Sequence, residues 1–235
     1  MNRLIEQPQT AAFFGYLEDW FATLKVWKSE EIFQSPERCA ILSVDLTEGF
    51  CHFGALASPR VAGLIDPVVH LMEDAWEQGV RNFVLSQDTH DPEAVEFSAW
   101  PPHCIRGTEE AETVETIKTL PFFKEMTLIE KNSIDSGMNG GLAAWITAHP
   151  QVDTFVVVGD CTDLCVYQLA MFLRLQANEK QQQRRVIVPE NCVQTYDLPV
   201  ETAREIGAVP HPGDLLHLLF LYHLALNGVE IVKSI

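Results

Sequence analysis

The sequence predicts an α/β fold of three layers, in which helices cover both faces of a mostly parallel sheet of roughly six strands. Two observations predict this fold. Short apolar runs alternate along the chain with longer stretches of helical periodicity. The runs are apolar at nearly every position, which is typical of strands that are buried on both faces. A helical extension, residues 1–37, is expected to precede the main domain, residues 38–235.

The elements can be placed in order along the chain. Apolar residues at helical spacing from Phe13 to Trp27 predict an amphipathic helix within the extension. After Pro36 the strand candidates are 39–44, 82–85, 127–129, 154–158, 186–188 and a less apolar run at 229–232. The helix candidates lie near 60–78, 109–118, 139–148, 163–177, 199–207 and 213–226. Strands that alternate with helices in this way indicate parallel pairing through crossover connections.

The composition narrows the range of partners. A formal net charge of −17 repels phosphate groups, so neither nucleic acid nor an anionic membrane is an expected partner. The sequence shows no apolar segment of transmembrane length and no signal peptide. Six scattered cysteines argue against a disulfide framework. We therefore expect a cytoplasmic protein that acts on a small molecule, and the apolar helix candidates near both chain ends could form a homo-oligomer interface.

Polar side chains follow three of the predicted strands at the points where these strands end. Asp45 follows the first strand, Lys131 the third, and Cys165 comes shortly after the fourth. The carboxyl ends of parallel strands meet at one edge of the sheet, so these side chains should lie together. Any one of them alone would be interpreted as a cap, a surface charge or core packing. Their joint occurrence predicts a cysteine nucleophile.

The chemistry of the three groups fits this prediction. Asp45 can take the thiol proton, and the Lys131 cation favours the thiolate. Cys165 is expected near the N-terminus of a helix, which Thr162 or Asp163 could cap.

A second polar cluster follows the second predicted strand. Asp88 and His90 are two residues apart, which places both side chains on one side of an extended chain. His103 follows two consecutive prolines that would hold it still. One carboxylate and two imidazoles suit zinc, iron or manganese, and Glu96 could be a further ligand. From spacing alone, the alternative that these are ordinary loop histidines stays equally open.

These motifs resemble those of the isochorismatase-like cysteine hydrolases, and most closely those of the nicotinamidase/pyrazinamidase branch. The resemblance extends from about Cys39 to Val188. It rests on Asp45 with Phe50-Cys51 and Gly54-Ala55-Leu56, Asp88-Thr89-His90, Trp100-Pro101-Pro102-His103-Cys104, Lys131, and Gly159 through Val166. It implies the Rossmann-like fold of that superfamily.

The resemblance also implies roles for individual residues. Asp45, Lys131 and Cys165 would be catalytic, and the backbone N–H groups of Cys161 and Cys165 would hold the oxyanion. A cis peptide bond would join Asp160 to Cys161. The implied ligands of a divalent metal, most simply zinc with iron or manganese as alternatives, are Asp88, His90 and His103. The implied substrate-binding residues are Phe50, Leu56 and Trp100.

The implied reaction is hydrolysis of a carboxamide, nicotinamide to nicotinate plus ammonia, through a thioester on Cys165. An alternative is a ureido or carbamoyl amide hydrolase of the same superfamily. An isochorismatase-type hydrolase, a non-catalytic metal-binding protein and a thiol redox protein explain fewer of the residues. Three positions, Thr47, Gly49 and Asp160, depart from the family's usual pattern. Asp160 places a carboxylate where small apolar residues are more usual.

Overall fold

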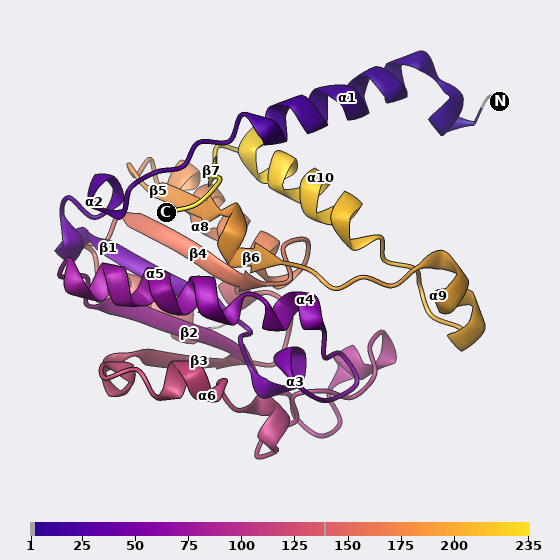
Figure 1. Ribbon diagram of the computed structural model, residues 1–235. Helices are drawn as coiled ribbons and strands as arrows, with labels where there is room; N and C mark the ends of the chain where they lie inside the picture. Colours follow the sequence, from indigo (N-terminus) through magenta and orange to yellow (C-terminus); the bar gives the residue numbers. More distant parts are fainter. Residues whose placement is uncertain (1–2, 139) are drawn as a thin grey trace.

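One sheet contains all the strands of the described chain, and it forms the middle layer of the molecule (Figure 1). The computed structural model describes residues 3–138 and 140–235. The strands are β1 (Cys39–Val44), β2 (Asn82–Asp88), β3 (Thr127–Lys131), β4 (Thr154–Asp160), β5 (Arg185–Pro189), β6 (Val193–Gln194) and β7 (Glu230–Val232). All pairs are parallel in the order β3-β2-β1-β4-β5-β7, and β6 pairs with β4. The predicted α/β fold is confirmed, with seven strands.

Helices cover both faces of this sheet (Figure 1). The α-helices are α1 (Pro8–Ala22), α2 (Ser29–Ile32), α3 (Glu48–Cys51), α4 (Pro59–Ala62), α5 (Ile65–Glu77), α6 (Glu115–Lys118), α7 (Gly140–Ala148), α8 (Cys165–Glu179), α9 (Val200–Ile206) and α10 (Gly213–Leu226). The 3-10 helices are Leu4–Glu6, Pro36–Arg38, Val95–Ser98, Glu109–Ala111, Phe123–Glu125, Ser136–Met138 and Glu190–Cys192.

Two apolar cores lie on opposite faces of the sheet. Helices α5 and α6 pack on one face, and α7, α8 and α10 pack on the other. Neighbouring residues of each central strand alternate between the cores, so that Ile41 belongs to the first and Leu42 to the second. This double burial explains why the strands are continuous apolar runs in the sequence.

The strand order reverses between β1 and β4. From β1 the chain proceeds outward to β2 and β3, and it then returns to the other side of β1 with β4. Loops diverge at such a point and leave a crevice at the carboxyl ends of the strands. Gly159 allows a close approach here, because a Cβ at this position, where φ is 108°, would lie 2.0 Å from the carbonyl oxygen of Val44.

Two helix candidates are interrupted for local reasons. The candidate at 60–78 divides into α4 and α5. Pro67 in the first turn of α5 has no backbone N–H and so cannot donate a hydrogen bond to the preceding turn. The candidate at 109–118 divides because Thr113 forms an antiparallel bridge with Thr47. The candidate at 139–148 appears as α7, and Asn139 lies outside the described residues.

The N-terminal helix α1 packs against α10, so the two apolar helices near the chain ends meet each other. Tyr222 of α10 contacts the rings of Phe13 and Trp20 edge-on, with centroids 5.6 and 5.3 Å apart. The helix ends at Ala22, earlier than the apolar pattern suggested, because the next segment pairs Val26 with Ser234. Within the described residues, no helix combines the length and apolar character needed to span a membrane.

Candidate active site

Three charged or nucleophilic side chains meet in the crevice at the strand reversal. Asp45 directly follows β1, Lys131 ends β3, and Cys165 begins α8. The Nζ atom of Lys131 lies 2.8 Å from Oδ2 of Asp45 and 3.6 Å from Sγ of Cys165. All three residues are buried, with exposed fractions of 1, 2 and 6% for Asp45, Lys131 and Cys165. The structure thus brings together the three residues that the sequence singled out.

The backbone holds Asp45 in a defined orientation. Its φ of 55° is in the left-handed region, which turns the chain away from β1 directly after the strand. Its amide donates to the carbonyl of Ser86, and its Oδ1 accepts a 2.7 Å hydrogen bond from the amide of Asp88. Oδ2 therefore remains for Lys131 and the thiol.

Lys131 is a buried cation with two carboxylate partners. Its ammonium forms an ion pair with Asp45 and a hydrogen bond with Oδ1 of Asp88. Burial acts to lower the pKa of Lys131, but the charges of Asp45 and Asp88 outweigh it and hold the pKa well above its usual value. The ammonium is thus charged, and it compensates two carboxylates that could not otherwise remain ionised in the interior.

Asp45 and Cys165 lie together at the centre of the site, and each changes the proton affinity of the other. Burial and the charge of Asp88 raise the pKa of Asp45 to about 6, although Lys131 opposes this. Burial also raises the pKa of the Cys165 thiol, and here Lys131 lowers it while Asp45 raises it further. Lys131 acts in the expected direction, but burial dominates. The resting thiol therefore keeps its proton beside a carboxylate that is a stronger base than an ordinary one.

The expected capping of α8 by Thr162 or Asp163 is wrong. The N-cap residue is Leu164, and no side chain caps the helix. Thr162 instead shares a 2.8 Å hydrogen bond with Nδ1 of His217, and Asp163 shares one of 2.8 Å with Nε2 of His211. These bonds attach the turn before Cys165 to α10 and to the segment that leads into it.

The two histidines that hold this turn were missed by sequence reasoning. They lie 55 and 48 residues from their partners, so no local pattern connects them. A buried carboxylate such as that of Asp163 requires a hydrogen-bond donor, but the sequence does not identify which residue supplies this donor.

The peptide bond between Asp160 and Cys161 is cis, as the resemblance implied. Cys161 and Cys165 both line the pocket at the crevice, on either side of the turn. Both thiols are free, and no disulfide joins them.

The metal candidates lie next to Cys165. Asp88, His90 and His103 are buried, and each offers an atom within 4.8 Å of those of the other two. Nδ1 of His90 is bonded to Oδ1 of Asn132, and Nδ1 of His103 to the carbonyl of Pro101. An acceptor at Nδ1 keeps the proton there and leaves Nε2 free as a ligand.

This arrangement fits a divalent metal ion. Nε2 of His90 is buried without a hydrogen-bond partner among the described residues. Nε2 of His90 and of His103 lie 3.5 and 3.7 Å from the same oxygen, Oδ2 of Asp88. A cation between them would satisfy all three atoms, and one carboxylate with two imidazoles suits zinc, iron or manganese.

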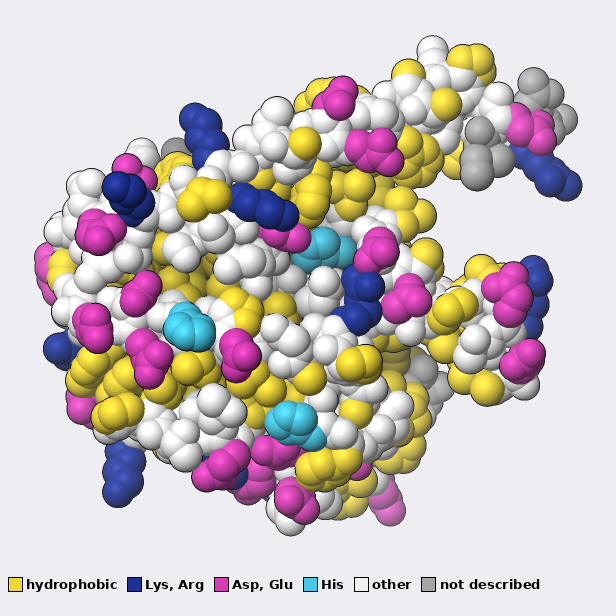
Figure 2. All heavy atoms as spheres, viewed as in Figure 1, with side chains coloured by type: hydrophobic (Ala, Val, Ile, Leu, Met, Phe, Trp, Pro, Cys, Tyr) yellow, Lys and Arg dark blue, Asp and Glu magenta, His cyan; other side chains and the backbone are white. Residues whose placement is uncertain are grey.

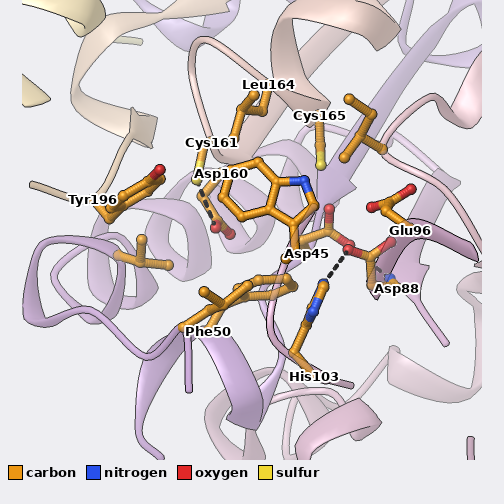
Figure 3. Close-up of a pocket in the computed structure, with 14 residues that line it drawn as sticks. Asp45, Phe50, Asp88, Glu96, His103, Asp160, Cys161, Leu164, Cys165 and Tyr196 are labelled. Atoms are coloured by element: carbon orange, nitrogen blue, oxygen red, sulfur yellow. Dashed lines mark hydrogen bonds and ion pairs between the residues drawn. The ribbon is translucent and has the colours of Figure 1, made fainter. Parts of the chain in front are cut away.

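Glu96 lies beside this group without belonging to it. It lines the same pocket, and its buried Oε1 has no hydrogen-bond partner within the described chain. Its oxygens fall outside the set of atoms that lie within 4.8 Å of one another. Figure 3 shows Glu96 on the same side of the pocket as Asp88 and His103.

The remaining walls of the pocket are mainly apolar. The residues that the resemblance implied for substrate binding, Phe50, Leu56 and Trp100, all line it. The ring of Phe50 packs against His103 with centroids 5.5 Å apart, which connects the apolar wall to the metal candidates. Lining residues that the sequence did not indicate are Val61, Ile134, Leu164 and Tyr196.

Comparison with known proteins identifies the family of the chain. A sequence profile of the isochorismatase domain matches residues 39–204. Nicotinamidase 1 of Arabidopsis thaliana is 29% identical over 214 residues, which cover 83% of this chain and 85% of the plant protein.

Solved structures with the same fold include two hydrolases of interest. The pyrazinamidase of Pyrococcus horikoshii in complex with zinc has a TM-score of 0.63 at 22% identity, covering 83% of this chain and 99% of that one. The N-carbamoylsarcosine amidase of Thermoplasma acidophilum has a TM-score of 0.62 at 22% identity, covering 84% and 96%.

Proposed function

Because the chain belongs to the isochorismatase family, we propose that it hydrolyses the carboxamide of nicotinamide, or of a closely similar heteroaromatic amide, through a thioester on Cys165. The chain is a hydrolase of carbon–nitrogen bonds other than peptide bonds. The observation that carries the finer proposal is the buried contact of Asp45, Lys131 and Cys165 at a pocket with aromatic walls.

The first half of the reaction uses Asp45 and Cys165 as an acid–base pair. Asp45 takes the proton of Cys165, and the thiolate forms while Lys131 is close enough to stabilise its charge. The sulfur attacks the carboxamide carbon, and the N–H groups of Cys161 and Cys165 are proposed to hold the oxyanion. Such donors are worth about 3–4 kcal/mol each to the transition state. The C–N bond then breaks, and ammonia leaves with the proton that Asp45 returns.

The second half of the reaction regenerates the thiol. Asp45 is ionised again after it has given up its proton, so it can deprotonate a water molecule that attacks the thioester carbon. The C–S bond breaks, the carboxylic acid is released, and the sulfur regains a proton. The same carboxylate thus serves as base and acid in turn, which a pKa near neutrality favours.

We propose that Asp88, His90 and His103 hold a divalent metal, zinc most simply, beside the nucleophile. When bound, the metal would coordinate the ring nitrogen of the substrate and so fix the ring relative to Cys165. Phe50, Leu56 and Trp100 are proposed to enclose the ring, since an uncharged planar substrate suits apolar and aromatic walls.

The second candidate is hydrolysis of an N-carbamoyl amide, because a known N-carbamoylsarcosine amidase shares the fold over 84% of this chain. The three metal candidates and the longer match to a nicotinamidase favour the heteroaromatic amide.

Ammonia release from nicotinamide, pyrazinamide and N-carbamoylsarcosine by the purified protein tests the proposal. We expect turnover of the two aromatic amides and little of the carbamoyl compound. Cys165→Ala should reduce kcat by roughly 10⁴-fold or more, as expected when a nucleophile is lost. Cys39→Ala is the matched control, because this buried thiol lies at the opposite end of β1. Full activity in Cys165→Ala with unchanged circular dichroism would exclude the mechanism.

We also propose that the chain forms a homo-oligomer through its two projecting segments. Phe13 and Tyr16 on α1 are 39 and 52% exposed, and Ile206 and Val209 at and beyond the end of α9 are 66 and 83% exposed. Figure 2 shows hydrophobic side chains on both projections. Light scattering of the purified protein, with Ile206→Asp as the disrupting variant, tests this proposal.

A further inference from the structure

The acidic side chain at the end of β4 enters the pocket without an ion-pair partner among the described residues. Asp160, the last residue of β4, is 1% exposed and lines the pocket together with Phe50 and Tyr196. Its Oδ1 has no hydrogen-bond partner in the described chain, and its Oδ2 accepts a hydrogen bond of 3.4 Å from the thiol of Cys161. An ionised carboxylate in this position would be costly, because neither oxygen has a positively charged partner in direct contact.

The surroundings of Asp160 favour its neutral form. Burial and the negative charge of Asp45 raise the pKa of Asp160 well above its usual value. Oδ2 accepts the hydrogen bond of the Cys161 thiol, so the proton of the neutral carboxyl is expected on Oδ1. Oδ1 is then an O–H donor that has no acceptor within the described part of the chain.

The position of Asp160 defines the part of the substrate that it can reach. Figure 3 shows its carboxyl on the side of the pocket occupied by Tyr196, away from Asp88, Glu96 and His103. It immediately precedes Cys161, whose N–H is proposed above to hold the oxyanion. In the proposed binding mode, the ring nitrogen of the substrate points toward the metal candidates and the carboxamide lies at Cys165. The edge of the ring beside the carboxamide then faces Asp160.

We propose that Asp160 is a specificity-determining residue that donates a hydrogen bond to an acceptor atom beside the scissile carboxamide, and that it favours aromatic amides that carry such an acceptor. Pyrazinamide is the simplest example, because it has a ring nitrogen next to the carboxamide-bearing carbon where nicotinamide has a C–H group. This inference rests on the proposed function. A buried donor that finds its acceptor only in the preferred substrate discriminates strongly, because the other substrate leaves it unpaired.

The ratio of kcat/KM for pyrazinamide to kcat/KM for nicotinamide tests the inference. Asp160→Leu, which has a similar shape but no donor, should lower this ratio by about tenfold. Asp160→Asn should keep it within about threefold of the original, because its amide can accept from Cys161 and donate to the substrate. Asp163→Asn is the matched control: Asp163 is also buried and lies in the turn that follows, but it does not line the pocket, so loosening this turn should affect both amides alike and leave the ratio unchanged.

A ratio that is the same in Asp160→Leu and in the unaltered protein would overturn the inference and leave the proposed function intact. Absence of turnover of both amides by the unaltered protein would instead overturn the proposed function, and the inference with it.

Infrared spectroscopy supplies a second measurement that does not depend on turnover. In the Cys165→Ala background at neutral pH, we expect the carbonyl stretch of a protonated carboxyl that disappears in Cys165→Ala/Asp160→Asn. Pyrazinamide should shift this band more than nicotinamide does. A band that is absent, or that responds equally to both ligands, would contradict the assignment of Asp160 as the donor.

Discussion

The two walls of the pocket differ in whether their buried acidic groups have a cationic partner. On the wall formed by the ends of β1, β2 and β3, Lys131 lies between Asp45 and Asp88, so each charge has a partner of opposite sign. On the wall formed by the end of β4 and the aromatic residues, Asp160 stands without a cation. The charged or acidic groups of the two walls are buried to the same degree, since Asp45, Lys131 and Asp160 are all at most 2% exposed.

This difference shows that burial alone does not decide what a carboxyl does. Beside Lys131, Asp45 has a pKa of about 6 and can exchange a proton during the reaction. Asp160 has no direct cationic partner, and burial and the charge of Asp45 raise its pKa well above the usual value although the more distant Lys131 opposes them, so we propose that its carboxyl keeps its proton and acts as a donor. The presence or absence of a cationic partner therefore separates the proposed general base from the proposed recognition group on opposite walls of one pocket.

The largest expected effect comes from breaking the paired wall. Lys131→Met should reduce the free energy of unfolding by about 3–5 kcal/mol, because it leaves Asp45 and Asp88 buried without their cation. It should also reduce turnover, since the thiolate loses the adjacent positive charge. Urea unfolding measures the first effect and ammonia release the second.

Lys233→Met is the control for this change. Lys233 also pairs with a carboxylate, Glu190, but its side chain is 44% exposed, so its loss should cost no more than about 1 kcal/mol. Equal destabilisation by the two substitutions would show that the buried ion pairs of Lys131 with Asp45 and Asp88 stabilise the protein no more than an exposed ion pair does.

An intermediate effect is expected from the metal candidates, which extend the paired wall. After treatment with a chelator, addition of zinc at about 100 times its dissociation constant should stabilise the protein by about 2.7 kcal/mol. His103→Ala should lose this response, because it removes one of the three ligands. His70→Ala should retain it, since His70 bonds only to the backbone of α5. Thermal unfolding with and without zinc measures the response, and a zinc-independent midpoint in the unaltered protein would count against the site.

The smallest expected effect comes from removing the unpaired carboxyl. The folded state raises the pKa of Asp160, so it binds the proton more tightly than the unfolded chain, whose carboxyl titrates near pH 4. The contribution of Asp160 to stability is therefore present below about pH 4 and is lost as the pH rises above that value. Asp160→Leu should be more stable than the unaltered protein by about 1–2 kcal/mol near pH 8, and by less near pH 5.

Urea unfolding at the two pH values measures this difference, with Asp135→Leu on a partly exposed loop as the control. A stability difference that does not change with pH would mean that Asp160 is ionised in the folded protein.

Much of the fold follows from local patterns. The continuous apolar run of β1 predicted a strand buried on both faces, and the alternation of such runs with helical stretches predicted parallel pairing. The two-residue β6 was missed, because so short a strand has no periodicity. The break between α4 and α5 was missed as well, although Pro67 marks it.

The candidate site was predictable where its residues lie at strand ends. Asp45 and Lys131 could be paired in advance, because the carboxyl ends of parallel strands meet at one edge. His211 and His217 could not be connected to the turn before Cys165, because only the packing of the later segments brings them there.

The sequence by itself determined the order of the elements, the residue types at the strand ends and the presence of a carboxyl at position 160. These properties depend on periodicity and on the chemistry of single residues. Only the tertiary structure decided which charges are paired and which are not, since the proton affinity of a buried group depends on everything packed around it. Asp45 follows a buried strand and Asp160 ends one, so the sequence makes them look alike. Only their different surroundings in the folded pocket give them the different roles that we propose, a base and a hydrogen-bond donor.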